Sequence, residues 1–289
     1  MSMIVCKDVD KLRAQLSEWR NNNETIAFVP TMGNLHDGHL SLIEIAQANA
    51  IRVVVSIYVN PLQFSPDEDF STYPRTLEQD LSKLKSSGVA LVFTPDTSTI
   101  YPDGEQQSAY VDVPALSSIL EGEFRPGFFK GVATVVLTLF NMVHPNCAVF
   151  GEKDFQQLLV IRRMVKDLSL PIEIIAAPTK REVDGLAMSS RNNYLNKSHR
   201  EKSRILSAAL KQFIDQLAQG ANAEQAQSDC IKLLLSQGFA ADYVSLRETS
   251  ALKKVSNSDI NSYKDLIVLA AVRLGETRLI DNIRFTVGA

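Results

Sequence analysis

The sequence FVPTMGNLHDGHL at residues 28–40 decides the fold of this chain. The apolar run from Thr25 to Val29 is typical of a strand, and a helical pattern of apolar residues begins at His39. We therefore expect a strand, a glycine-containing loop and a helix N-terminus. A helix N-terminus presents unpaired N–H groups and the positive end of the helix dipole, so phosphate is the ligand that it favours.

Two glycines and two histidines in this loop indicate phosphate chemistry. Gly33 and Gly38 leave room for a ligand close to the backbone. His36 and His39 are three residues apart and share one face of the first helical turn, where imidazoles can hydrogen-bond phosphate oxygens. Zinc binding is a weaker interpretation, because the spacing differs from H-E-x-x-H and the other two histidines and the three cysteines stand apart. The pattern T-x-G-x-x-H-x-G-H resembles the signature of the α/β nucleotidyltransferase superfamily, whose members attack the α-phosphate of ATP.

Composition indicates an ordinary globular protein. The chain has 289 residues, of which 45% are hydrophobic and 22% are charged, and this length favours two domains. A net charge of −3 gives no electrostatic reason to expect nucleic-acid or membrane binding. Three widely spaced cysteines suggest no disulfide framework. The first residues lack the basic and then apolar pattern of a signal peptide, and no apolar run reaches the roughly 18 residues of a membrane span, so we expect neither. We expect a cytoplasmic protein without a membrane span.

Strand and helix patterns alternate over residues 25–177. This alternation predicts about five parallel strands in a Rossmann-like, doubly wound α/β domain over residues 1–177. Residues 178–192, which include Met-Ser-Ser-Arg, are expected to form a polar hinge with no buried face. Two helical patterns (198–219 and 223–236) and three strand patterns (241–246, 266–272 and 277–283) then predict a smaller α+β lid domain over residues 193–289.

Polar residues follow the predicted strands, where ligands of open α/β sheets bind. Asn60 and Gln63 follow the β-branched strand at residues 51–59, although Asn-Pro could also serve only the turn. Gly151 ends the next central strand, and Lys153 beside it offers a charge for ATP phosphates. Gln157 lies in the following first helical turn. These residues are expected to line one pocket.

Other segments have open interpretations. Asp80 lies on the polar side of a predicted helix at residues 77–87, where a solvated position is favoured over contact with a metal-bound phosphate. Residues 100–130 are rich in glycine and proline, so we expect a lid or a dimer contact in which Arg125 reaches an anion. The apolar helix at residues 131–143 should be buried, with a subunit interface as one option.

Five blocks resemble the pantoate–β-alanine ligase family: FVPTMGNLHDGHL, YVNPLQF, YPRT, VFGEKDFQQL and DGLAMSSRN. They occur in the family's order from about residue 25 to 195, and Phe155 stands where some members have Tyr. The resemblance implies a homodimer that catalyses a two-step ligation. The carboxylate of (R)-pantoate attacks the α-phosphorus of ATP and releases pyrophosphate, and the amine of β-alanine then converts the pantoyl adenylate to pantothenate and AMP.

The resemblance also implies roles for residues. His36 and His39 would stabilise the transition state, His39 as proton donor, together with Lys153 and Arg191. Gln63 and Gln157 would bind pantoate, with Gln63 also bordering β-alanine and Asn60 beside it. Mg²⁺ would enter with ATP, held by phosphate oxygens and water, with Asp80 as the protein candidate. The ATP contacts would be Met32, Gly33, Asn34, Leu35, His36, Asp37, Gly38, His39, Gly151, Glu152, Lys153, Asp154, Val183, Met188, Ser189, Ser190 and Arg191.

Three other functions stay in view. A nucleotidylyltransferase would use the same motifs but keep AMP on its product, so β-alanine-dependent release of AMP separates the two. A fragment of an aminoacyl-tRNA synthetase would need a basic face and an anticodon-binding module that the sequence does not show. A nucleotide-binding module would bind ATP without turnover. A carboxylate substrate is already a nucleophile, which agrees with the absence of a nucleophile-elbow motif.

Overall fold

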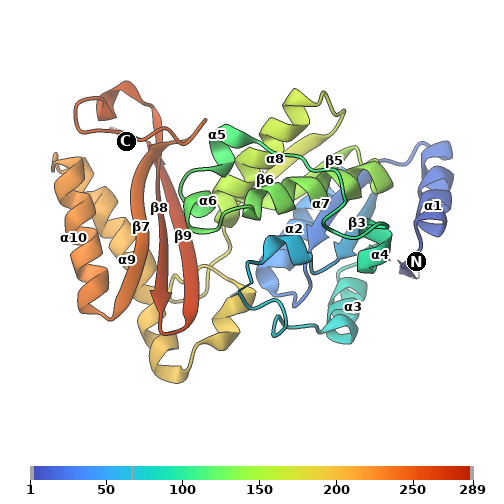
Figure 1. The fold of residues 1–289 in the computed structure, drawn as a ribbon, viewed down its shortest axis with the longest axis horizontal. Helices are drawn as coiled ribbons and strands as arrows, with labels where there is room; N and C mark the ends of the chain where they lie inside the picture. The colour runs from blue at the N-terminus through green and yellow to red at the C-terminus, as the bar shows by residue number, and fades with distance from the viewer. Residues whose placement is uncertain (1–2, 67, 287–289) are drawn as a thin grey trace. The chain divides into compact units, whose positions relative to one another are not determined.

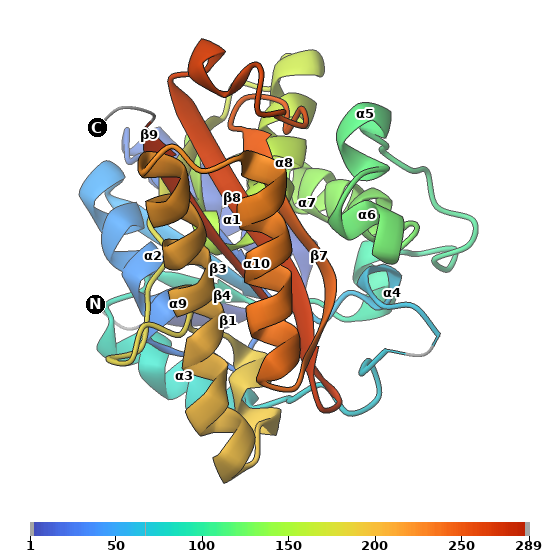
Figure 2. The ribbon, with the colours of Figure 1, turned by 90° about the vertical axis from the view of Figure 1, so that its left-hand side faces the viewer.

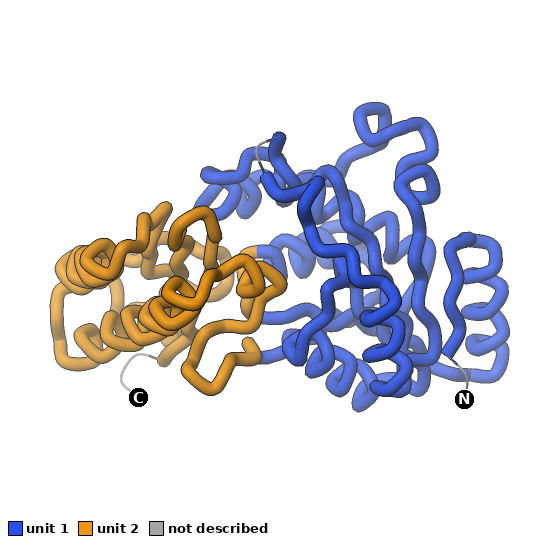
Figure 3. Tube along the Cα trace, turned by 90° about the horizontal axis from the view of Figure 1, so that it is seen from below, with its two compact units in different colours: residues 1–152, 157–178 blue, residues 153–156, 179–289 orange. Residues whose placement is uncertain are grey.

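The computed structural model describes residues 3–66 and 68–286 (Figure 1). The chain divides into two compact units (Figure 3). Unit 1 comprises Met1–Glu152 and Gln157–Pro178, and unit 2 comprises Lys153–Gln156 and Thr179–Ala289.

Unit 1 contains a six-stranded sheet of order β1-β4-β3-β2-β5-β6, in which all neighbouring strands are parallel. The predicted Rossmann-like α/β architecture is confirmed. The strand count was one too low, because β1 has only three residues and pairs at the sheet edge with β4. The strands are β1 (Ile4–Cys6), β2 (Ile26–Thr31), β3 (Arg52–Ile57), β4 (Leu91–Phe93), β5 (Cys147–Gly151) and β6 (Glu173–Ala177).

Helices cover both faces of this sheet. On β2, Phe28 packs edge-on against Phe140 of α7 at 6.3 Å between ring centroids, whereas Val29 clusters with Ile43 and Ala46 of α2. Successive side chains of a strand point to opposite faces, so both faces are buried. The long helices are α1 (Val9–Asn21), α2 (Asp37–Asn49), α3 (Leu77–Ser86), α7 (Phe128–Val143) and α8 (Phe155–Asp167); the shorter ones are η1 (Pro61–Gln63), α4 (Thr97–Ile100), α5 (Pro114–Ser117), α6 (Glu121–Phe124) and η2 (Glu152–Asp154).

The strand order reverses at β2. The chain runs from β2 to β3 and β4 on one side of the sheet, then returns to β5 and β6 on the other side of β2. Open α/β sheets bind ligands at the carboxyl ends of the strands where such a reversal occurs. The segments after β2, β3 and β5 contain the predicted site residues of this unit.

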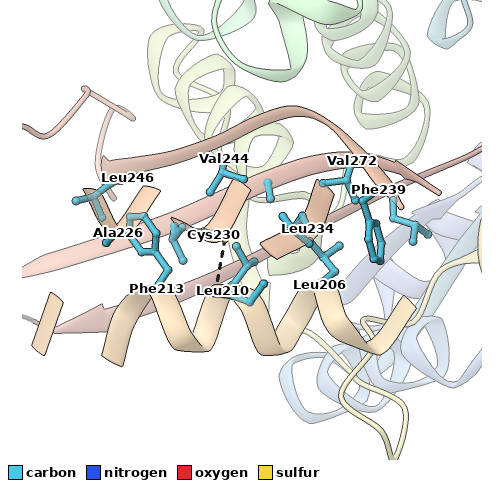
Figure 4. Close-up of a cluster of buried hydrophobic side chains, with 14 of the residues drawn as sticks. Leu206, Leu210, Phe213, Ala226, Cys230, Leu234, Phe239, Val244, Leu246 and Val272 are labelled. Carbon is cyan, nitrogen blue, oxygen red and sulfur yellow. Dashed lines mark hydrogen bonds between the residues drawn. The ribbon is translucent and has the colours of Figure 1, made fainter. Parts of the chain in front are cut away.

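Unit 2 contains an antiparallel sheet of order β7-β8-β9, with α9 and α10 packed on one face (Figure 2). Leu206 and Phe213 of α9 and Leu234 of α10 meet Val244 and Val272 of the sheet in one apolar cluster (Figure 4). The predicted α+β architecture is confirmed. The elements are η3 (Ser190–Tyr194), α9 (Lys197–Ala218), α10 (Ala223–Ser236), β7 (Phe239–Glu248), η4 (Ile260–Ser262), β8 (Asp265–Leu274) and β9 (Thr277–Thr286).

Residues 178–192 differ from the predicted polar hinge with no buried face. Arg181 and Ala187 form an antiparallel bridge, and the N–H of Met188 donates to Lys180 O at 3.0 Å. Leu186, Ala187 and Ser190 are buried. The segment is therefore an ordered hairpin. Within the described residues, no helix is long and apolar enough to cross a bilayer.

Candidate active site

The histidine loop, residues 32–39, connects β2 to α2. Gly33 and Asn34 both adopt left-handed conformations, with φ of 80° and 50°. A Cβ at Gly33 would lie 3.1 Å from both Asp80 Oδ2 and Ile57 Cγ2, so backbone geometry and crowding both favour glycine here. His36 is the N-cap of α2, so the helix begins at Asp37, two residues before the predicted start.

The backbone N–H groups of this loop have acceptors within the chain. The N–H groups of Asn34 and Leu35 donate to Asp80 at 2.9 and 2.8 Å. Those of Gly33, His36 and Gly38 donate to Thr31 Oγ1, His39 Nδ1 and His36 Nδ1 at 3.3, 3.3 and 3.1 Å. The prediction that unpaired N–H groups bind phosphate here is therefore wrong for these five groups.

The same bonds determine which histidine nitrogen can donate. His36 and His39 form a reciprocal capping box, and their ring centroids are 4.1 Å apart. Because Nδ1 of each ring accepts a backbone N–H, each neutral imidazole has its proton on Nε2. The two rings are thus arranged as a pair of Nε2–H donors, which suits the stabilisation of negative charge on a phosphate.

Asp80 lies beneath the histidine loop. Its side chain is 1% exposed, so the predicted solvated position is wrong. Both carboxylate oxygens accept loop N–H groups, and Thr76 Oγ1 donates to Oδ2 at 3.1 Å. Lys83, one turn further along α3, donates to Leu35 O at 2.5 Å. These bonds make Asp80 of α3 a structural support of the loop, in place of the metal contact considered from the sequence.

Asn60 and Gln63 follow β3 as predicted, but their amides have different surroundings. Asn60 is 1% exposed; its Nδ2 donates to Gln63 Oε1 and Gly131 O, both at 3.2 Å, and its Oδ1 accepts from Tyr101 at 2.9 Å and from the N–H of Leu62 at 3.3 Å. Its hydrogen-bonding capacity is therefore filled by the protein. This corrects the expectation of a direct substrate contact: Asn60 supports Gln63, and the bond to Oε1 orients Nε2 of Gln63 as the donor.

Arg125 has protein partners in place of the predicted anion. It donates to both carboxylate oxygens of Glu68 at 2.6 and 2.7 Å and to the backbone O of Gln63 at 2.9 Å. Glu121 lies 3.3 Å from the same guanidinium. Arg125 therefore holds Gln63 and the segment that follows it.

Gly151 ends β5, next to β2 in the sheet. A Cβ at Gly151 would meet nothing closer than Leu42 Cδ2 at 3.9 Å, an ordinary contact. Protein packing therefore does not require glycine at this position. Glu152 is half-buried in η2, and Gln157 is half-buried in the first turn of α8.

The remaining predicted ATP contacts belong to unit 2. Lys153 is half-buried, with Nζ 3.9 Å from the exposed Asp154 carboxylate. Val183 is fully exposed in the hairpin. Met188, Ser189 and Arg191 are half-buried, Ser190 is buried, and Ser189 Oγ accepts the N–H of Arg191 at 3.3 Å as the N-cap of η3.

Sequence reasoning missed several supporting residues. Thr76, Tyr101 and Lys83 support unit 1, and Arg181, Asp281 and Asn282 support unit 2. A signal existed for the last two, since Asp281 and Asn282 interrupt an apolar strand pattern at residues 279–283. A signal also existed for Asp80, which lies four residues before Leu84 and so shares its buried face.

Burial keeps two tyrosines and two cysteines of unit 1 neutral. Burial raises the pKa of Tyr58 to about 12 and also raises the pKa of Tyr101, so the phenol of Tyr101 stays a donor to Asn60. Burial likewise raises the pKa of the Cys6 thiol to about 11 and that of the Cys147 thiol above its ordinary value. These thiols are unsuited to nucleophilic catalysis.

Comparison with known proteins identifies the family of the chain. The family model described as pantoate-beta-alanine ligase matches residues 4–284. The pantothenate synthetase of Shewanella oneidensis is 49% identical over 283 residues, which cover 98% of this chain and 99% of that protein.

Two solved structures are also similar. The pantothenate synthetase of Thermus thermophilus matches with a TM-score of 0.90 and 43% identity, covering 97% of this chain and 99% of that one. The pantoate-beta-alanine ligase of Francisella tularensis was solved in complex with beta-gamma ATP and beta-alanine. It matches with a TM-score of 0.80 and 34% identity, covering 98% of this chain and 97% of that one. This chain belongs to the pantoate-beta-alanine ligase family.

Proposed function

We propose that this enzyme ligates (R)-pantoate to β-alanine with ATP and forms an enzyme-bound pantoyl adenylate. In the first step a carboxylate oxygen of pantoate bonds to the α-phosphorus, and the bond from that phosphorus to the bridging oxygen of pyrophosphate breaks. In the second step the amine of β-alanine attacks the acyl carbon, loses a proton and displaces AMP. The observation that best supports this proposal is the histidine pair, held as two Nε2–H donors at the carboxyl end of β2.

We assign roles to residues on the same basis. His36 and His39 donate to phosphate oxygens as negative charge develops, and His39 is the proton donor. Lys153 and Arg191 contribute positive charge to the ATP site, and the glycine at 151 allows the nucleotide to approach the backbone. Gln63, oriented by Asn60, and Gln157 bind pantoate through their amides.

Mg²⁺ enters this proposal with ATP as part of the substrate. Among the described residues, no group of three or more His, Cys, Asp or Glu side chains could hold a metal ion. We expect phosphate oxygens and water to bind the cation. Assembly as a homodimer follows from the family resemblance, a cytoplasmic location follows from the cysteine pattern and the N-terminal sequence, and both stay predictions.

The test is the fate of ATP. Pure protein with Mg²⁺ and (R)-pantoate should release about one equivalent of pyrophosphate per active site, and AMP and pantothenate should turn over only when β-alanine is added. AMP that stays attached to a product in the presence of β-alanine would favour a nucleotidylyltransferase. ATP left intact in both reactions would contradict the proposal.

A further inference from the structure

Two adjacent polar residues lie in the middle of β9, in an otherwise apolar stretch. Asp281 and Asn282 are 3% and 6% exposed and pair with Ala270 and Leu269 of β8. Burial of a charged or amide side chain is unfavourable unless hydrogen bonds compensate it. The partners of these two residues therefore indicate what they do.

Asp281 holds the Arg181 hairpin, residues 180–188. Arg181 donates to both carboxylate oxygens of Asp281 at 2.8 and 2.9 Å and to Asn282 O at 3.0 Å. The same guanidinium donates to Gly185 O at 3.0 Å, inside the turn of the hairpin. Because the hairpin runs directly into Met188–Arg191, the position of Arg181 determines where that segment begins.

Asn282 holds a second segment, the Lys153 turn at residues 153–156. Its Nδ2 donates to the backbone O of Lys153 at 2.8 Å, and its own N–H donates to Asp281 Oδ1 at 2.7 Å. Further along β9 is a second contact with this turn, since the Arg284 guanidinium lies 5.8 Å from the centroid of the Phe155 ring. The Lys153 turn thus has two contacts with the strand that holds the hairpin.

We infer that Asp281 and Asn282 are positioning residues that fix, from one strand, both ATP-binding segments of unit 2. The inference rests on the proposed assignment of Lys153 and Met188–Arg191 to ATP. These segments are separated by more than twenty residues in the sequence, and β9 brings their supports to adjacent positions. Catalytic contacts are sensitive to displacement, since an error of about 1 Å costs about a hundredfold in rate.

The test uses Asn282→Asp and Arg181→Lys in the full-length protein. Asn282→Asp keeps the shape of the side chain but replaces the donor to Lys153 O by an acceptor. Arg181→Lys keeps the charge but loses the bidentate bond. The matched control is Asp242→Asn, which removes the Arg278–Asp242 ion pair of 2.8 Å between β9 and β7.

Hydrogen exchange measures positioning without reference to activity. Asn282→Asp should speed exchange about tenfold at residues 153–156, and Arg181→Lys should do so at residues 180–191, while Asp242→Asn should change neither segment. Exchange that stays at the wild-type rate in both segments would overturn the inference.

Kinetics measure whether the positioned segments serve ATP. Both variants should raise KM for ATP about tenfold, with KM for pantoate changed less than about twofold. If both variants lost thermal stability as Asp242→Asn does but kept the wild-type KM for ATP, Asp281 and Asn282 would have only a structural role. This result would overturn the inference. A wild-type protein that does not consume ATP would instead contradict the proposed function, and the exchange result would still be interpretable.

Discussion

Asp80 in unit 1 and Asp281 in unit 2 are both buried carboxylates that hold segments of the proposed site, but they use different partners. Asp80 accepts two backbone N–H groups of the histidine loop itself, whereas Asp281 binds the guanidinium of Arg181, which in turn holds a hairpin. Amide N–H groups stabilise a carboxylate by partial charges, and a guanidinium does so by a full charge.

The difference has a consequence for each unit. Asp80 accepts two N–H groups that could otherwise bind phosphate, and the imidazoles of His36 and His39 are donors that the loop keeps for a ligand in the proposed function. Asp281 binds the side chain of Arg181 and no backbone N–H group of Met188–Arg191 in the contacts described above, so in the proposed function this segment can contact ATP. We therefore expect unit 1 to act mainly on the rate of the chemical step and unit 2 mainly on ATP binding.

The largest effect is expected from His39→Ala. Removing a donor that acts on developing charge should lower kcat for adenylate formation by about 10²–10³, with a much smaller change in KM for ATP. Single-turnover measurement of pyrophosphate release checks this. The control is His144→Asn, because His144 is exposed and its φ of 46° is tolerated by asparagine. Near-normal turnover of His39→Ala would remove the histidine from its role and break the contrast between the units.

A smaller effect is expected from Asp80→Asn. In the variant an NH₂ group replaces one carboxylate oxygen, so it faces a loop N–H that is also a donor. A buried donor without an acceptor costs about 1–3 kcal/mol. The free energy of unfolding should fall by this amount, and kcat should fall about tenfold because the loop that holds both histidines shifts. Urea denaturation and steady-state kinetics measure the two effects.

Glu78→Gln is the matched control for Asp80→Asn, since Glu78 is exposed in the first turn of the same helix. It should leave both stability and kcat near the wild-type values. If Asp80→Asn raised KM for ATP and spared kcat, unit 1 and unit 2 would not divide chemistry and binding as we expect.

The sequence predicted elements whose signals are local. The apolar run before Pro30 and the helical pattern from His39 placed β2 and α2 within two residues, since their periodicity reports which faces are buried. The predicted neighbours Gly33, Gln63 and Lys153 also follow parallel strands of the sheet, as the strand pattern required.

The supports could not be predicted because their partners are distant in sequence. In the sequence, Asp80 is more than forty residues from the N–H groups that donate to it, and Asn282 is 129 residues from Lys153. A polar residue on an apolar face indicates that some partner exists, but only the tertiary fold identifies the partner. The amide of Asn60 likewise has distant partners: it accepts from Tyr101 and donates to the backbone O of Gly131. The sequence does not reveal these bonds, so it predicts a substrate contact at Asn60 that the structure does not support.

The smallest effect is expected from the outer ion pair of the hairpin, Asp184 with Arg200. Arg200 donates to Asp184 at 2.5 Å, and this hydrogen bond holds the pKa of that carboxyl below its ordinary value of 3.8. A carboxyl whose pKa is lowered by folding stabilises the native state above its unfolded pKa, and this contribution is lost as the pH falls. The two side chains are 29% and 36% exposed, so Asp184→Asn should lower the free energy of unfolding at pH 7 by less than about 1 kcal/mol.

Urea denaturation of wild type and Asp184→Asn between pH 7 and pH 3 checks this prediction. The difference between the two proteins should shrink toward pH 3, because the wild-type carboxyl then begins to bind a proton in the unfolded chain and subsequently in the folded one. KM for ATP should stay at the wild-type value, since the buried Asp281–Arg181 pair and not the exposed pair fixes the hairpin. If Asp184→Asn raised KM for ATP as much as Arg181→Lys, the hairpin would be held from its outer side. Asp184, and not Asp281, would then be the carboxylate of unit 2 that corresponds to Asp80 of unit 1.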